Sequence, residues 1–146
     1  MRSRTSQWFE VAFRYDKVQE DGAKKPVTEQ YVVDALSFSE GEKKITEEMS
    51  PYVSGVCSVR SMKRANFREV FFSDKTGDDK WYKAKLQFIT LDEKTEKEKR
   101  SNVVYLIQAG SFDKAKQSIS EIMGGTMIDY VVVTVTETKI MDVFEH

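Results

Sequence analysis

Two segments of the chain alternate apolar residues with polar or small residues at every second position. They are WFEVAFRY at residues 8–15 and WYKAKLQF at residues 81–88. A period of two is typical of a β-strand with one buried and one open face. A charged stretch follows each strand, at residues 16–26 and 92–102. Both stretches are too polar to be buried, so we interpret them as solvated hairpin connections.

The next segments, around residues 31–36 and 103–109, are apolar on both faces. Such runs favour strands in the centre of a sheet. Further strands are expected over residues 57–64 and 130–138. A short segment that ends in Val-Phe then closes each half of the chain.

Two helices are predicted between the central strands and the later strands. Ser37 is a good N-cap, with Glu40 three residues later as in a capping box, and Ser111 is the second N-cap. Each helix has one apolar stripe, which we expect to face the core. The stripes are Phe38, Gly41, Ile45, Met49 and Tyr52 in the first helix and Phe112, Ala115, Ile119, Ile122 and Met123 in the second.

The two halves match each other in sequence order. YVVDALSFSEGEKKI from Tyr31 resembles YLIQAGSFDKAKQSI from Tyr105, and the alternating strands at Trp8 and Trp81 also match. Internal repeats of this kind predict repeated structural units. The expected fold is therefore α+β: a tandem duplication of a β-β-α-β-β unit, largely antiparallel sheet with helices packed on it. The repeats would span residues 1–73 and 74–146 and pack as one compact domain about a pseudo-twofold axis. The alternative is chance similarity of two β-rich segments.

Composition limits the classes of function. Apolar residues make up 40% of the chain, enough for a core, and a net charge of −1 gives no overall attraction to nucleic acid or membranes. The single cysteine, Cys57, excludes an internal disulfide and is expected to be a small buried hydrophobe. No signal peptide and no apolar run of about 20 residues occurs, so we expect no membrane span and a cytoplasmic location. No cofactor is expected.

A basic cluster is the first candidate site. It consists of Arg60, Lys63, Arg64 and Arg68, and the second half of the chain has no equivalent. Arginine and lysine could bind phosphates of DNA or RNA there. The alternative is a solvated strand edge on which cations discourage pairing with other strands.

Two tryptophans are the second candidate. Trp8 and Trp81 fall on the polar faces of the alternating strands, near Arg14, Lys83 and Lys85. If the two indole rings are exposed, they could stack on the bases of single-stranded nucleic acid. The alternative is that each indole packs into the protein.

Acidic residues and catalytic groups give weaker signals. Glu69, Asp74, Asp78, Asp79, Asp142 and Glu145 do not follow the spacing of a known metal loop, so no metal site is expected. The one histidine, His146, lies at an end of the chain that we expect to be frayed. No phosphate-binding loop occurs, so the sequence predicts no enzyme.

Three segments of the sequence indicate a family: VTEQYVVDALSFSEGEKKITEEM, YKAKLQFITLDEKTEKEKR and TETKIMDVFEH. They resemble an uncharacterised domain-of-unknown-function family of small soluble proteins from Bacteroidetes and their phages or mobile elements. The resemblance implies a cytoplasmic protein and supplies no site residues.

These observations lead to two hypotheses of function. The first is a non-enzymatic binding or adaptor protein that acts by protein–protein contact with an unknown partner. The second is a nucleic-acid-binding accessory protein of mobile-element DNA metabolism that uses the basic cluster.

Overall fold

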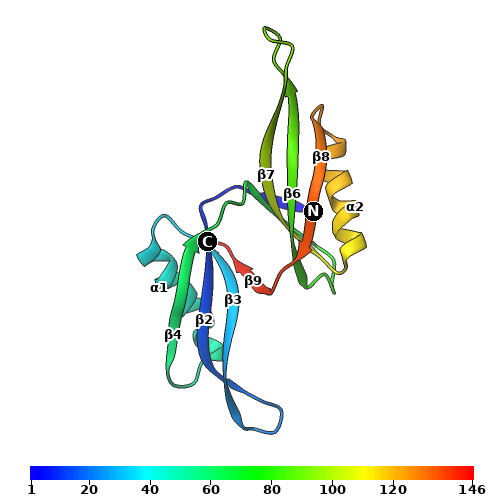
Figure 1. The fold of residues 1–146 in the computed structure, drawn as a ribbon. Coiled ribbons are helices and arrows are strands. Elements are labelled where there is room, and N and C mark those ends of the chain that lie inside the picture. The colour runs from blue at the N-terminus through cyan, green and yellow to red at the C-terminus, as the bar shows by residue number, and fades with distance from the viewer. The chain divides into compact units, whose positions relative to one another are not determined.

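The computed structural model describes residues 1–146 and has a mixed α+β fold with two sheets and two helices (Figure 1). The chain forms two units, and neither is one continuous stretch. Unit 1 comprises residues 1–5 and 67–138, and unit 2 comprises residues 6–66 and 139–146. Most strand pairs are antiparallel, so the α+β class is confirmed.

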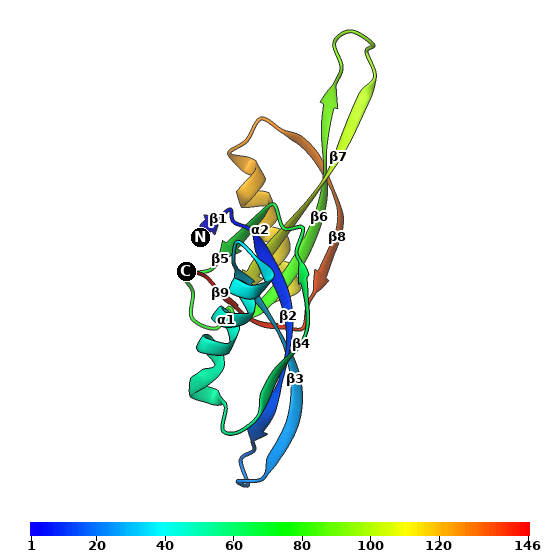
Figure 2. The same cartoon turned by 90° about the vertical axis from the view of Figure 1, so that its left-hand side faces the viewer.

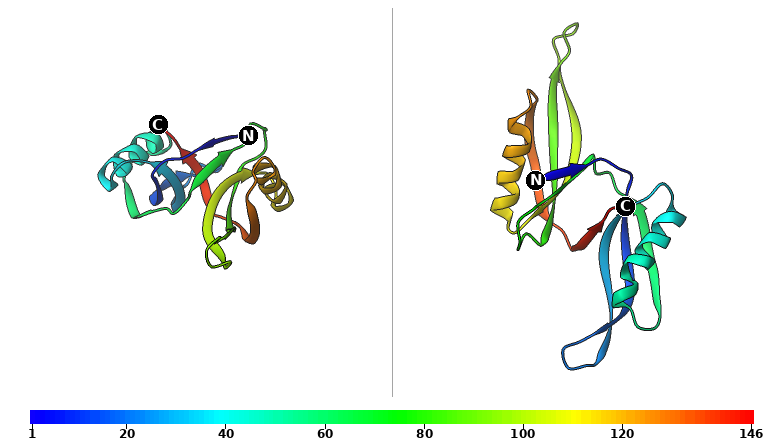
Figure 3. Two further views of the ribbon diagram at one scale, coloured as in Figure 1. Left: turned by 90° about the horizontal axis from the view of Figure 1, so that it is seen from above. Right: turned by 180° about the vertical axis from the view of Figure 1, so that it is seen from behind.

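Unit 2 has a four-stranded sheet with one α-helix. Its strands lie in the order β4-β2-β3-β9, and β9 runs parallel to β3. The elements are β2 (Trp8–Val18), β3 (Lys24–Asp34), α1 (Phe38–Met49), the 3₁₀ turn η1 (Ser50–Tyr52), β4 (Cys57–Arg64) and β9 (Ile140–Phe144). The helix α1 lies along one face of the sheet (Figure 3).

Unit 1 has a five-stranded sheet with one helix. Its strands lie in the order β1-β5-β7-β6-β8, and β5 runs parallel to β7. The elements are β1 (Arg2–Arg4), β5 (Glu69–Phe72), β6 (Lys80–Leu91), β7 (Glu98–Ala109), α2 (Phe112–Gly124) and β8 (Asp129–Glu137). The helix α2 lies against one face of this sheet (Figure 2).

A strand from the other half of the chain completes the sheet of each unit. In unit 2 it is β9, whose Asp142 lies opposite Tyr31, and in unit 1 it is β5, whose Glu69 lies opposite Tyr105. The sequence predicted these two short strands but not the sheets in which they pair.

The helices begin and pack as predicted. Ser37 accepts a hydrogen bond from the backbone of Glu40, and Ser111 accepts one from Lys114. Ser and Thr hydroxyls at this position satisfy N–H groups that the helix leaves free. The central stripe residues are buried: Gly41, Ile45, Met49, Ala115, Ile119 and Met123. A Cβ atom at Gly41 would already touch Met62 and Ala35, so a small residue lets α1 lie close to the sheet.

The outer members of the stripes are exposed. Phe38 and Phe112 are each 48% exposed, and Tyr52 is 67% exposed. The prediction that Tyr52 belongs to the buried stripe is wrong, because Pro51 turns the chain into η1 before that residue. Cys57 is only partly buried, against the core of unit 2.

The hairpin loops are shorter than the charged stretches that were predicted to form them. Residues 16–18 pair with residues 24–26, and residues 89–91 pair with residues 98–100, so each hairpin continues into its charged segment. Exposed strands need no apolar face when both of their faces meet water. No helix in the structure is long and apolar enough to cross a membrane.

Candidate functional site

The two sheets have corresponding edge strands, β4 in unit 2 and β8 in unit 1. Each pairs with one neighbour, and each has a one-residue bulge. Val59 and Ser61 pair with consecutive residues of β2, which leaves Arg60 as the extra residue. Val132 and Thr134 likewise pair with consecutive residues of β6, which leaves Val133 as the extra residue.

The edge strand β8 exposes apolar side chains. Val131, Val132 and Val133 are 37%, 44% and 46% exposed. An exposed edge strand with β-branched residues offers unpaired backbone N–H and C=O groups to another chain. No lysine, arginine or proline interrupts β8, and its two charged residues, Asp129 and Glu137, lie at its ends.

A groove of about 330 Å³ lies between β8 and α2. Phe112 and Ile119 of α2 line it together with Tyr130, Val132 and Val135 of β8. Phe112 is half exposed there, so the groove has an accessible apolar wall.

Cations lie near the middle of β8 on both faces of the sheet. Lys116 lines the groove itself, with its ammonium 5.4 Å from the centre of the Phe112 ring. On the opposite face Lys85 is exposed and pairs across the sheet with Thr134 of β8. The middle of β8 is therefore flanked by positive charge.

The four residues of the basic cluster do not form one set within a unit. Arg60, Lys63 and Arg64 lie on β4 of unit 2, whereas Arg68 belongs to unit 1. Lys63 forms an ion pair with Glu10 at 3.2 Å.

Arg64 is held by two kinds of contact. It donates a hydrogen bond of 3.2 Å to Gln7, and its guanidinium lies 5.0 Å from the Phe9 ring centre and 5.4 Å from that of Phe38. Cations on β4 are the arrangement expected of a protected edge.

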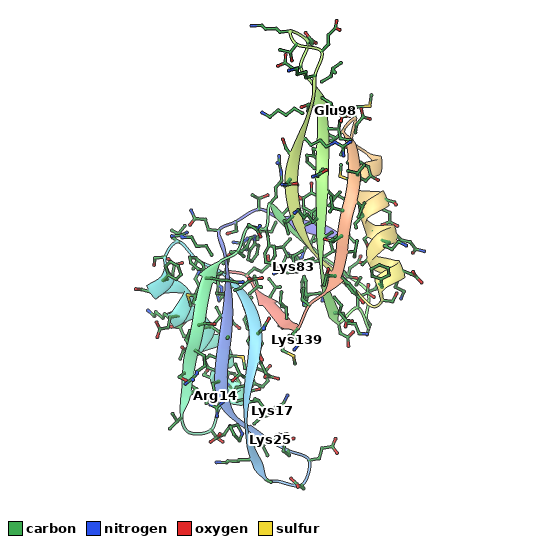
Figure 4. All side chains as sticks on the ribbon, in the orientation of Figure 1. Arg14, Lys17, Lys25, Lys83, Glu98 and Lys139 are labelled. Carbon is green, nitrogen blue, oxygen red and sulfur yellow. The ribbon has the colours of Figure 1, made fainter.

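Both tryptophans are buried. Trp8 and Trp81 are each 2% exposed, and the Trp81 ring meets the Phe72 ring edge-on at 5.6 Å. The indole N–H of Trp8 has no hydrogen-bond partner. The structure therefore has the alternative, in which each indole packs into the protein and does not lie on an open face. Lys83, which shares that face of β6, lies 5.4 Å from the Phe67 ring centre (Figure 4).

The acidic residues form no site. No group of three or more acidic, histidine or cysteine side chains is placed to hold a metal ion. Asp78 instead accepts a hydrogen bond from Ser73, and Asp142 accepts one from the backbone of Val143.

The expectation that His146 is frayed is wrong. Its backbone N–H donates to the buried carboxylate of Asp34 at 3.0 Å, and its ring nitrogens lie 3.2 Å from Asp34 and 2.9 Å from Glu48. These contacts hold the end of β9 in unit 2.

Sequence reasoning missed a polar network inside unit 2. Tyr15 and Tyr31 both donate hydrogen bonds to Glu29, which also pairs with Lys17 at 3.2 Å. Burial and the Glu29 carboxylate raise the pKa of Tyr15 to about 12, and the same two causes raise the pKa of Tyr31. Burial alone would raise the pKa of Glu29, but the hydrogen bonds from both tyrosines and Lys17 lower it. The sequence contains a signal for this network: Glu29 lies two residues before Tyr31, and residues two apart share a face of a strand.

Comparison with known proteins gives a family and no activity. A family model described as a domain of unknown function (DUF4494) matches residues 7–146. No curated protein and no solved structure matches the chain.

Proposed function

The chain belongs to the DUF4494 family, a domain of unknown function, and we propose that it is a non-enzymatic protein that binds another protein through the edge strand β8. The observation that carries this proposal is the exposed valine run of β8 beside an apolar groove. An extended segment of the partner would add to the sheet of unit 1 as a further strand.

The backbone would supply affinity, and the groove would supply specificity. In strand addition, main-chain hydrogen bonds join the partner to the edge, and alternate side chains enter pockets. The wall formed by Phe112 and Val132 suits apolar side chains at every second position of the partner.

The positive charges near β8 indicate which side chains the partner segment would carry. Lys85 and Lys116 border the middle of the strand on opposite faces. We therefore expect acidic residues at the centre of the partner segment, which these ammonium groups would attract. Lys85 lies on β6, one strand beyond β8, so its attraction is weaker than the roughly 0.2–1 kcal/mol of opposite charges on directly neighbouring strands.

A second copy of this chain fits the edge less well. Antiparallel pairing of β8 with itself about Val133 would place Asp129 opposite Glu137 at both ends of the strand. Like charges directly opposite each other destabilise a strand pair. The charge pattern thus favours a different protein as the occupant.

The test is a selection of displayed peptides on the wild-type protein. We expect the selected peptides to alternate apolar residues with polar or acidic residues. Their affinity for the Val133→Arg variant should be at least tenfold lower than their affinity for wild type. The matched control is Arg60→Val, at the corresponding bulge of β4, which should keep full binding of these peptides. Failure to select any peptide, or equal binding of selected peptides to Val133→Arg, would contradict the proposal.

Nucleic-acid binding is the second candidate, and it rests on the exposed cations of β4. Arg60 is exposed without an ion pair, and the Lys63 side chain is 75% exposed. The test is fluorescence anisotropy with labelled single- and double-stranded oligonucleotides at about 50 mM salt, where phosphate contacts are strong. Affinity should fall severalfold in Arg60→Ala/Arg64→Ala, and equal binding by this double variant would remove the candidate.

We further propose that the chain arose by tandem duplication of a β-β-α-β-β unit over residues 1–73 and 74–146. The shared strand order β4-β2-β3 and β8-β6-β7 and the matching bulges support this origin. Packing of the repeats as one compact domain, a cytoplasmic location and a source in Bacteroidetes or their phages or mobile elements stay predictions.

A further inference from the structure

Three exposed residues of α2 form a row along the groove at β8: Phe112, Lys116 and Ser120. They are spaced four residues apart, which places them one above the other on the same face of the helix. Ile119 also lines the groove, but it belongs to the buried core of unit 1. A strand added at β8 would therefore meet an aromatic ring, an ammonium group and a hydroxyl in succession.

The spacing of this row suits the side chains of an extended segment. Four residues of an α-helix rise about 6 Å along its axis, and alternate residues of a β-strand lie roughly 6.6–6.8 Å apart. Alternate side chains of a strand also point to the same face of its sheet. Three alternate side chains of the partner can therefore each contact one member of the row.

The row offers one charge and one hydroxyl to the partner. The ammonium of Lys116 lies 5.4 Å from the centre of the Phe112 ring and forms no ion pair, whereas that of Lys114 lies 4.0 Å from Asp78. An acidic side chain beside Lys116 would thus be attracted by a charge that no carboxylate of unit 1 neutralises. The Ser120 hydroxyl donates to the backbone oxygen of Lys116 at 3.5 Å, so its own oxygen can still accept a hydrogen bond.

The direction of α2 sets the order in which the partner meets these residues. Residues 125–128 join α2 to β8, and the two elements lie side by side and run in opposite directions (Figure 1). Antiparallel strand pairs are slightly more stable per residue than parallel pairs. A partner strand antiparallel to β8 runs in the same direction as α2, so it meets Phe112 first and Ser120 last.

We propose that the partner segment presents three alternate side chains to this row, in the order large apolar, acidic, and hydroxyl or amide. The apolar side chain packs on Phe112, the carboxylate pairs with Lys116, and the third side chain donates a hydrogen bond to Ser120. This motif rests on the proposed function, because it needs the partner to add as a strand at β8. It extends that function from a preference for charge to an ordered recognition sequence.

The test is a library of short displayed peptides in which threonine alternates with three randomised positions, each of which can be Phe, Leu, Glu, Lys or Ser. Selection on the wild-type protein should enrich Phe or Leu at the first randomised position, Glu at the second and Ser at the third. A synthetic peptide with the selected residues should bind about tenfold or more tightly than the same peptide with serine in place of its apolar residue. The reason is that a large apolar side chain leaves water when it packs in the groove.

Charge reversal identifies the residue that recognises the acid. Selection on the Lys116→Glu variant should enrich Lys instead of Glu at the second position and leave the first position unchanged. Because this variant gains a new class of binder, loss of folding cannot produce the result. The matched control is Lys85→Glu, which makes the same change of charge on the opposite face of the sheet and should select the same peptides as wild type.

Two results would overturn the motif. One is selection of peptides with no preference at the second position, or with the same preference on wild type and Lys116→Glu. The other is enrichment in the reverse order, with the apolar residue last. In both cases, loss of binding of the selected peptides to Val133→Arg would still support the strand contact at β8. Failure to select any peptide from this library would overturn the motif even where other peptides bind the edge.

Discussion

Arg60 and Val133 occupy the same place in two different sheets: each is the extra residue of the bulge in an edge strand. A bulge twists an edge away from regular pairing, and a charged side chain on it adds further protection. The β4 edge has both devices, whereas the β8 edge has the bulge with an exposed valine. The two edges are therefore expected to behave differently toward other chains.

Exchange of these two residues should exchange the behaviour of the edges. Where copies of the chain associate at raised concentration despite the like charges that disfavour pairing of β8 with itself, Val133→Arg should slow this association severalfold, because a cation on β8 opposes edge-to-edge pairing. Arg60→Val should accelerate it by leaving β4 unprotected. Static light scattering over time at raised protein concentration measures both. The same association rate in the two variants would show that edge chemistry does not control association.

The helix stripes predict a large cost for truncating their central residues. Ile45 is 0% exposed and Ile119 is 2% exposed. Ile45→Ala or Ile119→Ala should each lower the free energy of unfolding by about 2–5 kcal/mol, because a cavity replaces the side chain. Urea denaturation followed by circular dichroism measures the change. Lys43→Ala, on the exposed face of α1, is the control and should stay within about 0.5 kcal/mol of wild type.

Strand β9 should stabilise residues that lie more than a hundred positions earlier in the chain. Deletion of residues 139–146 removes the parallel partner of Gln30–Val33 and leaves β3 as an edge. Hydrogen exchange of the outward-facing amides of β3 should accelerate about tenfold or more, equivalent to about 1.4 kcal/mol of lost local stability.

Two controls accompany this deletion. His146→Ala keeps β9 and the backbone hydrogen bond to Asp34, so β3 should stay protected. The amides of β6, in unit 1, should also keep their protection in the deletion variant. Unchanged exchange in β3 after the deletion would contradict the pairing of β9 with β3.

The tyrosine network predicts loss of stability at high pH. The pKa of Tyr15 rises from 10.0 to about 12 on folding, through burial and its hydrogen bond with Glu29. The folded state therefore keeps its proton where the unfolded state loses it, so this stabilisation is complete below about pH 10 and falls as the pH rises toward 12.

Urea denaturation at a series of alkaline pH values measures this dependence. Tyr15→Phe should be less stable at neutral pH, because it loses the hydrogen bond, and should lose less stability between about pH 10 and 12. Tyr52→Phe, at an exposed tyrosine, is the control and should follow wild type. An identical alkaline slope for Tyr15→Phe and wild type would disprove the role of Tyr15.

The sequence by itself determined most of the elements of this protein, although it did not predict the short strand β1. Period-two alternation located β2 and β6, and the hydroxyls of Ser37 and Ser111 fixed the helix starts. Buried Ile45 and Ile119 followed from the helical stripe. These features depend on neighbours within a few residues, which is the distance over which periodicity and capping act.

Only the tertiary structure decided which elements pair and what becomes buried. The short strands β5 and β9 have backbone groups that any open sheet edge can bond, so their sequences do not specify their partners. Trp8 and Trp81 follow a polar pattern along their strands but are buried in the tertiary structure. Only the structure shows that Arg60 and Val133 lie on edge strands, where a cation and a valine have different effects on pairing with other chains. A strand's position in a sheet depends on long-range pairing, which the local sequence does not specify.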